Sequence, residues 1–535
     1  MIRTLLALIL ALLALGCHGA PGPPTPEDKA AREAILSDDW AEVLPAARAW
    51  KAAAPADPIA LWLFAHASSQ HGDHAAASKA FLRLDPQKDA EKWLAWATSL
   101  AGQKPGGAIA NLLWGLALDD TGEYDKALAA LDKAVRLAPE SSFAHRARGV
   151  TKTAARNTAG AVADLTEAIA LHPKDAAAYY VRSYAYSRRG EYARALADCD
   201  RGIALAPDDP SAHYARALVY YDENDYPRAL HDLNTAIALE PGFPEAYCAR
   251  GLVHCGDGDY KRALADYDKA ISLLPNLPQA YHSRSVVHSH MGHDARARAD
   301  LKIAIRQYGD AISFRDNDAD AYHNRGIARY ADHDYRRTIA DFDKTISLDP
   351  SDAECYHYRG CAHLWRKDYD RALRDFDKAI ALRPDRALDY AWRGLAHYRR
   401  RDYEKAVADY STAASLDPNE ASTYYSRGLA YHHTGDYDRA IADYTKAIAL
   451  TPEDHDAYHS RGLCHYNKED YAQAIADFDK AIALKPSEAR VHRDKADACK
   501  RAGRAKEATA AQGQFLHKLP ADAIRKALSK VRGRD

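Results

Sequence analysis

One phrase of about thirty residues recurs along this chain of 535 residues at a spacing of 34. Tyr458–Pro486 reads YHSRGLCHYNKEDYAQAIADFDKAIALKP, and Tyr424–Pro452 reads YYSRGLAYHHTGDYDRAIADYTKAIALTP. Prolines mark the period, because they stand at 139, 173, 207, 241 and 275 and again at 350, 384, 418, 452, 486 and 520. Every interval is 34 except one of 75, which is two periods plus seven. Such self-similarity predicts an array of stacked, nearly identical structural units.

Fixed positions of the unit carry small and apolar residues at helical spacing. In the unit 455–488, counted from position 1 at His455, these are Tyr458, Gly462, His465, Tyr471, Ala474, Phe478, Ala481 and Pro486. The pattern resembles the tetratricopeptide repeat, a helix–turn–helix unit. The resemblance implies an all-α fold, a right-handed superhelical solenoid with twelve units between Ala108 and Asp522.

The register of the repeat divides the chain. Residues 108–311 hold six units, 319–488 hold five, and 489–522 hold a degenerate one. We expect the seven-residue excess at 312–318 to extend the preceding helix by two turns, so that a helix protrudes near residues 300–315. A solenoid needs caps because each repeat buries its apolar face only against neighbours. Degenerate helical repeats at 27–107 and an amphipathic helix at 521–535 are the predicted caps.

The first seventeen residues, MIRTLLALILALLALGC, combine Arg3, an apolar run and a small Gly16 before Cys17. The segment resembles a bacterial lipoprotein signal peptide, which implies lipidation of Cys17 and a Pro/Gly-rich tether at 18–26. An ordinary secretory signal is the alternative. The resemblance implies a lipid-anchored protein of the bacterial cell envelope. His18 stands where an Asp would suggest inner-membrane retention, which favours the outer membrane.

A second regularity pairs opposite charges. Position 7 is Arg in ten consecutive units, and an Asp follows sixteen residues later. We expect ion pairs between the two helices of each unit, because the planar guanidinium fork matches a carboxylate. A ladder of arginines that binds an acidic polymer is the alternative. The pairs are Arg148–Asp164, Arg182–Asp198, Arg216–Asp232, Arg250–Asp266, Arg284–Asp300, Arg325–Asp341, Arg359–Asp375, Arg393–Asp409, Arg427–Asp443 and Arg461–Asp477.

By the same family resemblance, positions 5, 12 and 13 of the first helices line a concave groove. They supply Tyr180, Tyr214, Tyr221, His282, His290, His323, Tyr330, His357, Trp365, Tyr398, Tyr425, His432, His433, His459 and Tyr466. Flat rings with polar edges suit recognition, although an idle solvated groove is the alternative. Its histidines predict a pH dependence of binding between roughly pH 5 and 7.

The function predicted from these features is a non-enzymatic scaffold. No phosphate-binding loop, nucleophile elbow, HExxH or dinucleotide turn occurs, and we predict neither a cofactor nor a metal. Lys plus Arg (73) balances Asp plus Glu (75), which gives no general electrostatic reason to bind nucleic acid. We expect a peptide or protein partner in envelope assembly, secretion or export. The alternative is a glycan or polymer in surface polysaccharide export, and the sequence predicts no oligomeric state.

Overall fold

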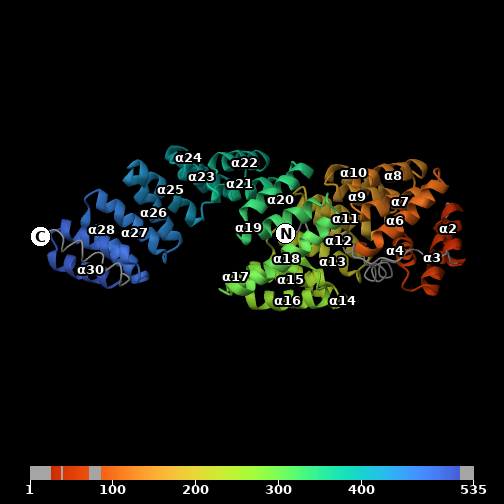
Figure 1. Cartoon of the computed structure of the whole chain (residues 1–535), viewed down its shortest axis with the longest axis horizontal. Coiled ribbons are helices and arrows are strands. Elements are labelled where there is room, and N and C mark those ends of the chain that lie inside the picture. Colours follow the sequence, from red (N-terminus) through yellow and green to blue (C-terminus); the bar gives the residue numbers. More distant parts are fainter. Residues whose placement is uncertain (1–25, 38–39, 71–85, 519–535) are drawn as a thin grey trace. The chain divides into compact units, whose positions relative to one another are not determined.

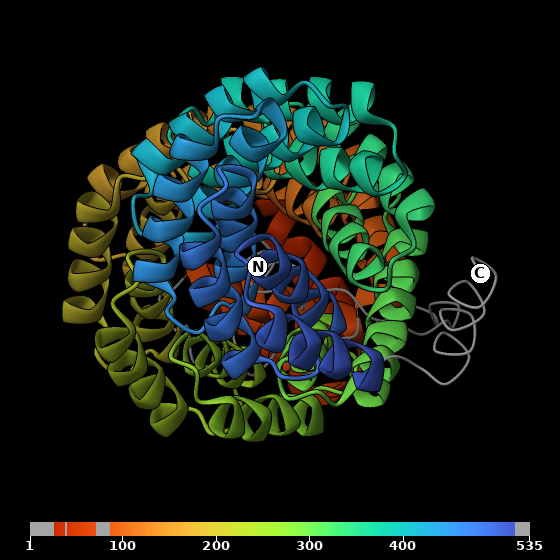
Figure 2. The same cartoon turned by 90° about the vertical axis from the view of Figure 1, so that its left-hand side faces the viewer.

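The computed structural model describes residues 26–37, 40–70 and 86–518, and these residues contain 28 helices and no strand (Figure 1). The chain forms two compact units. Unit 1 comprises the residues up to 334 together with 347–349, and unit 2 comprises 335–346 and the residues from 350 onward. Within each unit, helices that follow one another in the chain pack against one another, as the colour sequence shows (Figure 2).

Unit 1 begins with four helices and continues with six helix pairs and α19. The first four are α2 (Pro26–Ser37), α3 (Trp40–Ala53), α4 (Pro58–Gln70) and α6 (Pro86–Gln103). The pairs are α7 (Ala108–Asp120) with α8 (Tyr124–Leu137), α9 (Ser142–Ala154) with α10 (Thr158–Leu171), α11 (Ala176–Ser187) with α12 (Tyr192–Leu205), α13 (Pro210–Asp222) with α14 (Tyr226–Leu239), α15 (Pro244–Gly256) with α16 (Tyr260–Leu273), and α17 (Pro278–His290) with α18 (Asp294–Phe314). Helix α19 spans Ala319–Ala331.

Unit 2 begins with residues 335–346 of α20 (Tyr335–Leu348) and continues with five further helix pairs. These are α21 (Ala353–Trp365) with α22 (Tyr369–Leu382), α23 (Ala387–Arg399) with α24 (Tyr403–Leu416), α25 (Ala421–Thr434) with α26 (Tyr437–Leu450), α27 (His455–Asn467) with α28 (Tyr471–Leu484), and α29 (Ala489–Arg501) with α30 (Ala505–Lys518).

Tryptophans form the core of the four helices that precede the repeats. The rings of Trp62 and Trp93 are nearly parallel, with centroids 6.1 Å apart, and both are fully buried. Trp62 Nε1 donates a hydrogen bond to Asp120 Oδ2 at 2.7 Å, which ties this core to the first helix of the first pair. The described residues of 27–107 therefore pack onto the N-terminal end of the array.

The repeated residues explain the helix pair. In the pair α27–α28, Asp454 accepts hydrogen bonds from the backbone N–H of Asp456 and Ala457, so it caps the first helix. Between the helices, a methyl group added at Gly462 would lie 2.7 Å from the ring of Phe478. Only glycine therefore permits this approach of the two helices.

The helix with the seven-residue excess is α18, which is 21 residues long, whereas the second helices of the other pairs in unit 1 have 14. Seven residues are close to two turns, so the buried face continues through Ala304, Tyr308 and Ile312. The predicted protrusion is wrong: Arg315, which follows the helix, is buried and donates a hydrogen bond to the backbone oxygen of Asp120.

Position 7 forms a ladder of ion pairs through both units. In nine repeats the Arg donates through Nε and Nη2 to the two oxygens of the Asp sixteen residues later, at 2.6–3.0 Å. The nine are Arg148–Asp164, Arg182–Asp198, Arg216–Asp232, Arg250–Asp266, Arg284–Asp300, Arg359–Asp375, Arg393–Asp409, Arg427–Asp443 and Arg461–Asp477.

Each of these arginines also reaches the preceding repeat. Its Nη1 donates at 2.6–3.1 Å to a polar side chain sixteen residues earlier: Asp132, Thr166, Asp200, Asn234, Asp268, Asp343, Asp377, Ser411 or Thr445. The guanidinium of Arg393 also lies over the ring of Tyr390, 5.5 Å from its centre. All three guanidinium nitrogens thus bind within the protein, which argues against an arginine ladder for an acidic polymer.

Several predicted segments lie outside the described residues. These are the signal segment with Cys17, nearly all of the tether, and the capping helix at 521–535, so their assignments stay predictions. Among the helices that the structure does describe, none is both long and apolar enough to cross a membrane.

The ladder predicts unequal effects for two aspartates that bind the same arginine. Asp409 is buried, whereas the side chain of Asp377 is 61% exposed. Replacement Asp409→Ala leaves Arg393 without its bidentate partner and should cost about 2–4 kcal/mol, near the range for breaking a buried pair. Asp377→Ala should cost less than about 1 kcal/mol, as exposed pairs do. Thermal unfolding of the two variants checks this, and equal melting temperatures would refute the structural role of the ladder.

Candidate binding surface

The predicted groove residues at position 5 are mostly buried, which corrects their assignment as ligand contacts. Tyr214, His282, His323, His357 and His459 have exposed fractions of 0–6%. Tyr180 and Tyr425 are partly buried. A partner could not reach the five buried side chains without moving the first helices apart.

Two of the buried histidines at position 5 bind the following repeat. The Nδ1 atom of His357 lies 2.6 Å from Asp389 Oδ1, and His459 Nε2 lies 2.8 Å from Asp494 Oδ2. Each of these carboxylates belongs to the next first helix along the chain. The tyrosines do the same more weakly, since the hydroxyl of Tyr180 donates to Asp209 Oδ2 at 3.4 Å.

Burial also lowers the pKa of two of these histidines, which weakens the predicted pH response. It lowers the pKa of His282 to about 4, and burial is the main cause that lowers the pKa of His357. The imidazole of His282 therefore stays neutral between pH 5 and 7, and burial disfavours the charged form of His357. A pH dependence of binding would have to come from histidines at the surface.

Positions 12 and 13 do reach the surface. Tyr221, Tyr330, Tyr398, His432 and Tyr466 are partly exposed, and His290, Trp365 and His433 are exposed. Five of these lie at the C-terminal ends of the first helices of unit 2, and we call them the aromatic edge: Trp365, Tyr398, His432, His433 and Tyr466. Among them, 47% of the surface of Trp365 is exposed.

Tyrosines at position 17 orient these rings, and sequence reasoning missed them as part of the surface. The rings of Tyr403 and His433 are stacked at 4.9 Å, and those of Tyr335 and Trp365 at 6.4 Å. In each stack the Tyr begins the second helix of the repeat before. The recurrence of Tyr at this position every 34 residues was the available signal.

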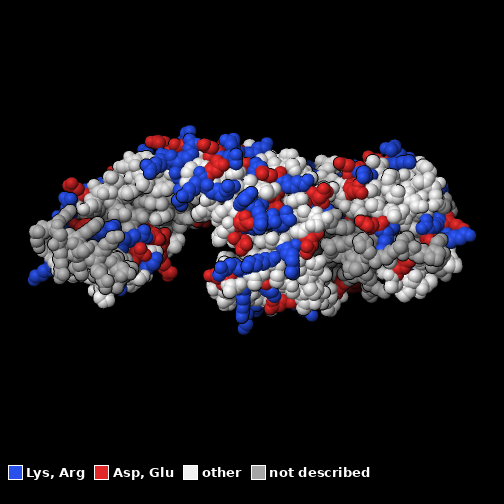
Figure 3. All heavy atoms as spheres, viewed as in Figure 1, with Lys and Arg blue, Asp and Glu red and all other residues white. Residues whose placement is uncertain are grey.

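Charges around the aromatic edge are mixed. Arg400 donates to Asp370 at 2.5 Å, and its Nε lies 3.2 Å from Asp402. The face shown in Figure 3 likewise carries basic and acidic side chains close together. The edge thus offers stacked rings with polar rims among paired charges, which suits contact with a polypeptide surface or an extended segment.

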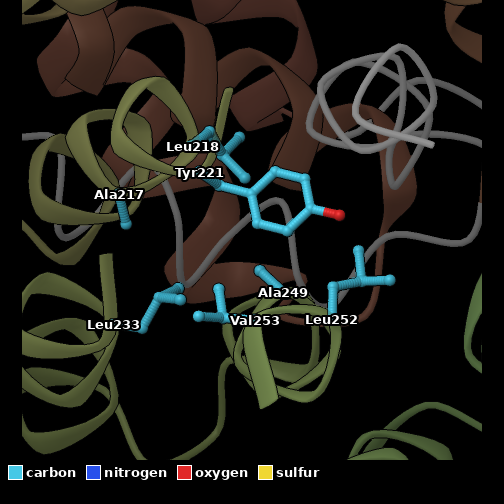
Figure 4. A pocket seen from close by; sticks show the side chains of 7 residues that line it. All are labelled: Ala217, Leu218, Tyr221, Leu233, Ala249, Leu252 and Val253. Carbon is cyan, nitrogen blue, oxygen red and sulfur yellow. The ribbon is translucent and has the colours of Figure 1, made fainter. Parts of the chain in front are cut away.

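Unit 1 contains one further depression near a predicted residue. Ala217, Leu218 and Tyr221 of α13 line it with Leu233 of α14 and Ala249, Leu252 and Val253 of α15 (Figure 4). The space inside it is only about the size of one water molecule, far below the roughly 300 Å³ at which small-molecule sites begin. The depression is therefore too small for a cofactor.

Three side chains at the start of α27 could each offer a ligand atom to a cation. The ligand atoms of Asp454, His455 and Asp456 lie within 4.8 Å of one another. Asp454 already accepts two backbone hydrogen bonds as a helix cap. Capping accounts for the arrangement without an ion.

Family models described as tetratricopeptide repeat match most of the array. The matched residues are 88–142, 146–210, 183–254, 244–277, 353–386, 396–463 and 455–488. The chain belongs to the tetratricopeptide repeat family. Tetratricopeptide repeat proteins are generally non-catalytic scaffolds, and their fold is typical of protein–protein interaction.

Several solved structures are similar to this chain at low sequence identity, with TM-scores below 0.5. The crystal structure of the APC/C hetero-tetramer Cut9-Hcn1 is 14% identical over 89% of this chain and 96% of that chain, with a TM-score of 0.48. The crystal structure of yeast Tom70 covers 81% of this chain and 97% of its own chain at 17% identity, with a TM-score of 0.37. The crystal structure of MamA covers 32% of this chain and 94% of its own chain at 26% identity, with a TM-score of 0.30. No curated protein matches the chain significantly.

The buried imidazole of His282 makes the stability of the protein depend on pH. Its folded pKa of about 4 lies below the unfolded value near 6.5, so the unfolded state binds more protons between these values. Stability should therefore fall as the pH drops from 6.5 to 4, by up to about 3 kcal/mol for this group. Melting temperatures at pH 7 and pH 4.5 should differ less in His282→Leu than in the wild type.

His290 provides the matched control because it lies on the same helix but is exposed. His290→Leu should keep the acid sensitivity of the wild type. If the two variants respond alike, His282 does not carry the effect.

Proposed function

We propose that this protein is a non-enzymatic scaffold that binds a peptide segment or protein through the aromatic edge of unit 2. The observation that carries the proposal is the exposure of Trp365 and His433, whose rings are held in place by stacking on tyrosines of the preceding repeat. Rigid aromatic side chains lose little conformational entropy on binding and often dominate interface energies. Position 5, by contrast, serves the contacts between repeats.

We further propose that the scaffold acts in the bacterial cell envelope, in assembly, secretion or export machinery, and that lipid on Cys17 anchors it. The support is the apolar segment that ends in Gly16–Cys17 and the Pro/Gly-rich residues after it. A single acyl chain gives only marginal membrane binding, and stable anchoring takes more than one. Multiple acylation at one cysteine would meet that need. We place the anchor in the outer membrane because His18 follows the cysteine.

A glycan or other polymer is the second candidate ligand, in surface polysaccharide export. The nearly parallel stack of Tyr335 and Trp365, 13° between ring planes, favours it, since a flat apolar face also suits a sugar ring. A glycan array probed with the full chain separates the two. Saturable binding to sugars that Trp365→Ala abolishes would favour the polymer over a peptide.

Site-specific photo-crosslinking in the native envelope tests the aromatic edge. A photoreactive residue in place of His433 should crosslink to a defined protein, and Trp365→Ala in the same chain should reduce the yield at least about fivefold, the effect of losing roughly 1 kcal/mol. Leu416 is the control, because it is 40% exposed but ends a second helix. Equal products from positions 433 and 416 would move binding away from the edge.

The anchor has a separate test. In Cys17→Ser the protein should leave the membrane fraction, because no thiol remains to carry the lipid, while helix content stays unchanged. Fractionation of cells that express each form, with metabolic labelling by a fatty-acid analogue, measures both points. A labelled or membrane-bound Cys17→Ser protein would refute lipidation at this residue and leave the binding surface untested by that result.

A further inference from the structure

Within unit 1, two segments nearly 200 residues apart meet. Arg315, directly after α18, donates a hydrogen bond to the backbone oxygen of Asp120, at the end of α7. Asn317 Nδ2 donates to the backbone oxygen of Gly122 at 2.7 Å. Gly122 has a φ of +78°, and a methyl group added there would lie 3.2 Å from both Arg315 and Asn317. The turn between α7 and α8 thus closely fits the end of α18.

A second contact lies one repeat further along. Arg156, in the turn between α9 and α10, forms ion pairs with Asp320 at 2.5 Å and with Asp349. All three side chains have exposed fractions below 20%. The turns that end the first helices of the first two repeats therefore bind Arg315, Asn317, Asp320 and Asp349, all of which belong to unit 1.

The seven-residue excess is what brings these groups together. Without the two extra turns, α18 would end about 10 Å earlier, at 1.5 Å of rise per residue, and Arg315 could not reach Asp120. The apolar face of α18 stays buried through Ile312, so the extension keeps its packing while it carries the polar residues outward. The other second helices of unit 1 stop after 14 residues.

The contact is polar, unlike the contacts between neighbouring repeats. The described interactions across it are hydrogen bonds and ion pairs, whereas adjacent repeats share apolar cores such as the one around Tyr214, Leu233 and Val253. Small polar contacts between parts of one chain permit relative motion. Salt screens such largely buried ion pairs only weakly, so the removal of one partner is the direct way to break the contact.

We propose that Arg315, Asn317 and Arg156 form a clasp that closes unit 1 upon itself and opens reversibly. In the closed state the array makes a complete turn whose ends are joined through 120–122, 156, 315–317, 320 and 349. In the open state the repeats keep their helix pairs, and the distance between the joined segments increases. The clasp concerns unit 1 alone and is independent of the ligand proposed for the aromatic edge.

Distance measurements across the clasp test this. Spin labels introduced as noncanonical amino acids at Lys126 and Asp316, both exposed, report the separation in the full chain by pulsed electron resonance. The wild type in low salt should give mainly one short distance. Arg156→Ala should raise the population with a longer distance about fivefold or more, while the helix content remains constant.

Arg296, exposed on α18 away from the contact, is the control, and Arg296→Ala should match the wild type. Should Arg156→Ala fail to fold, Asn317→Ala removes a single hydrogen bond and gives the same readout. A single unchanged distance in every variant would overturn the opening. A long distance in the wild type at low salt would overturn the clasp itself.

Discussion

The rest of the structure depends on one interaction, the three-way contact of the arginine at position 7. Its bidentate hydrogen bonds to the Asp of the second helix hold the two helices of one repeat together. Its Nη1 donates to a side chain on the second helix of the preceding repeat and so joins neighbouring repeats. The hydrogen bonds that Arg393 donates to Asp409 are the main cause that raises the pKa of Arg393, so the charge is never lost at physiological pH. Apolar packing alone tolerates sliding, but a planar fork between two carboxylates does not.

This ladder determines where recognition can occur. Because positions 7 and 5 both serve contacts between helices and repeats, the polar groups of the first helices are largely used inside the array. The ends of those helices are not, since their neighbours are turns. Trp365 and His433 therefore project from the array, and they are oriented by Tyr335 and Tyr403. Recognition at the ends of the first helices follows from the way the repeats are joined.

The helix pairs and their register were predictable because they depend on residues within 34 positions of one another. The burial of His357 was not, because it depends on Asp389 in the following repeat, and position 5 of a family member is otherwise read as groove. The same limit applies to α18. The position of the excess residues and their helical form were predictable from the sequence. The hydrogen bond from Arg315 to the backbone oxygen of Asp120, 195 residues earlier, was not.

Two kinds of contact thus hold unit 1, and they differ in how they fail. Contacts between neighbouring repeats combine apolar burial with the arginine ladder. The loss of one such contact therefore destabilises the folded repeats on both sides of it and favours unfolding. The clasp joins segments that each remain folded without it, since every helix in it already belongs to a packed pair or packs on its neighbour. Breaking the clasp costs a few polar contacts and leaves the repeats intact. The open state of the clasp should therefore lie at a lower free energy than the unfolded state, so that the clasp opens under conditions in which the repeats remain folded.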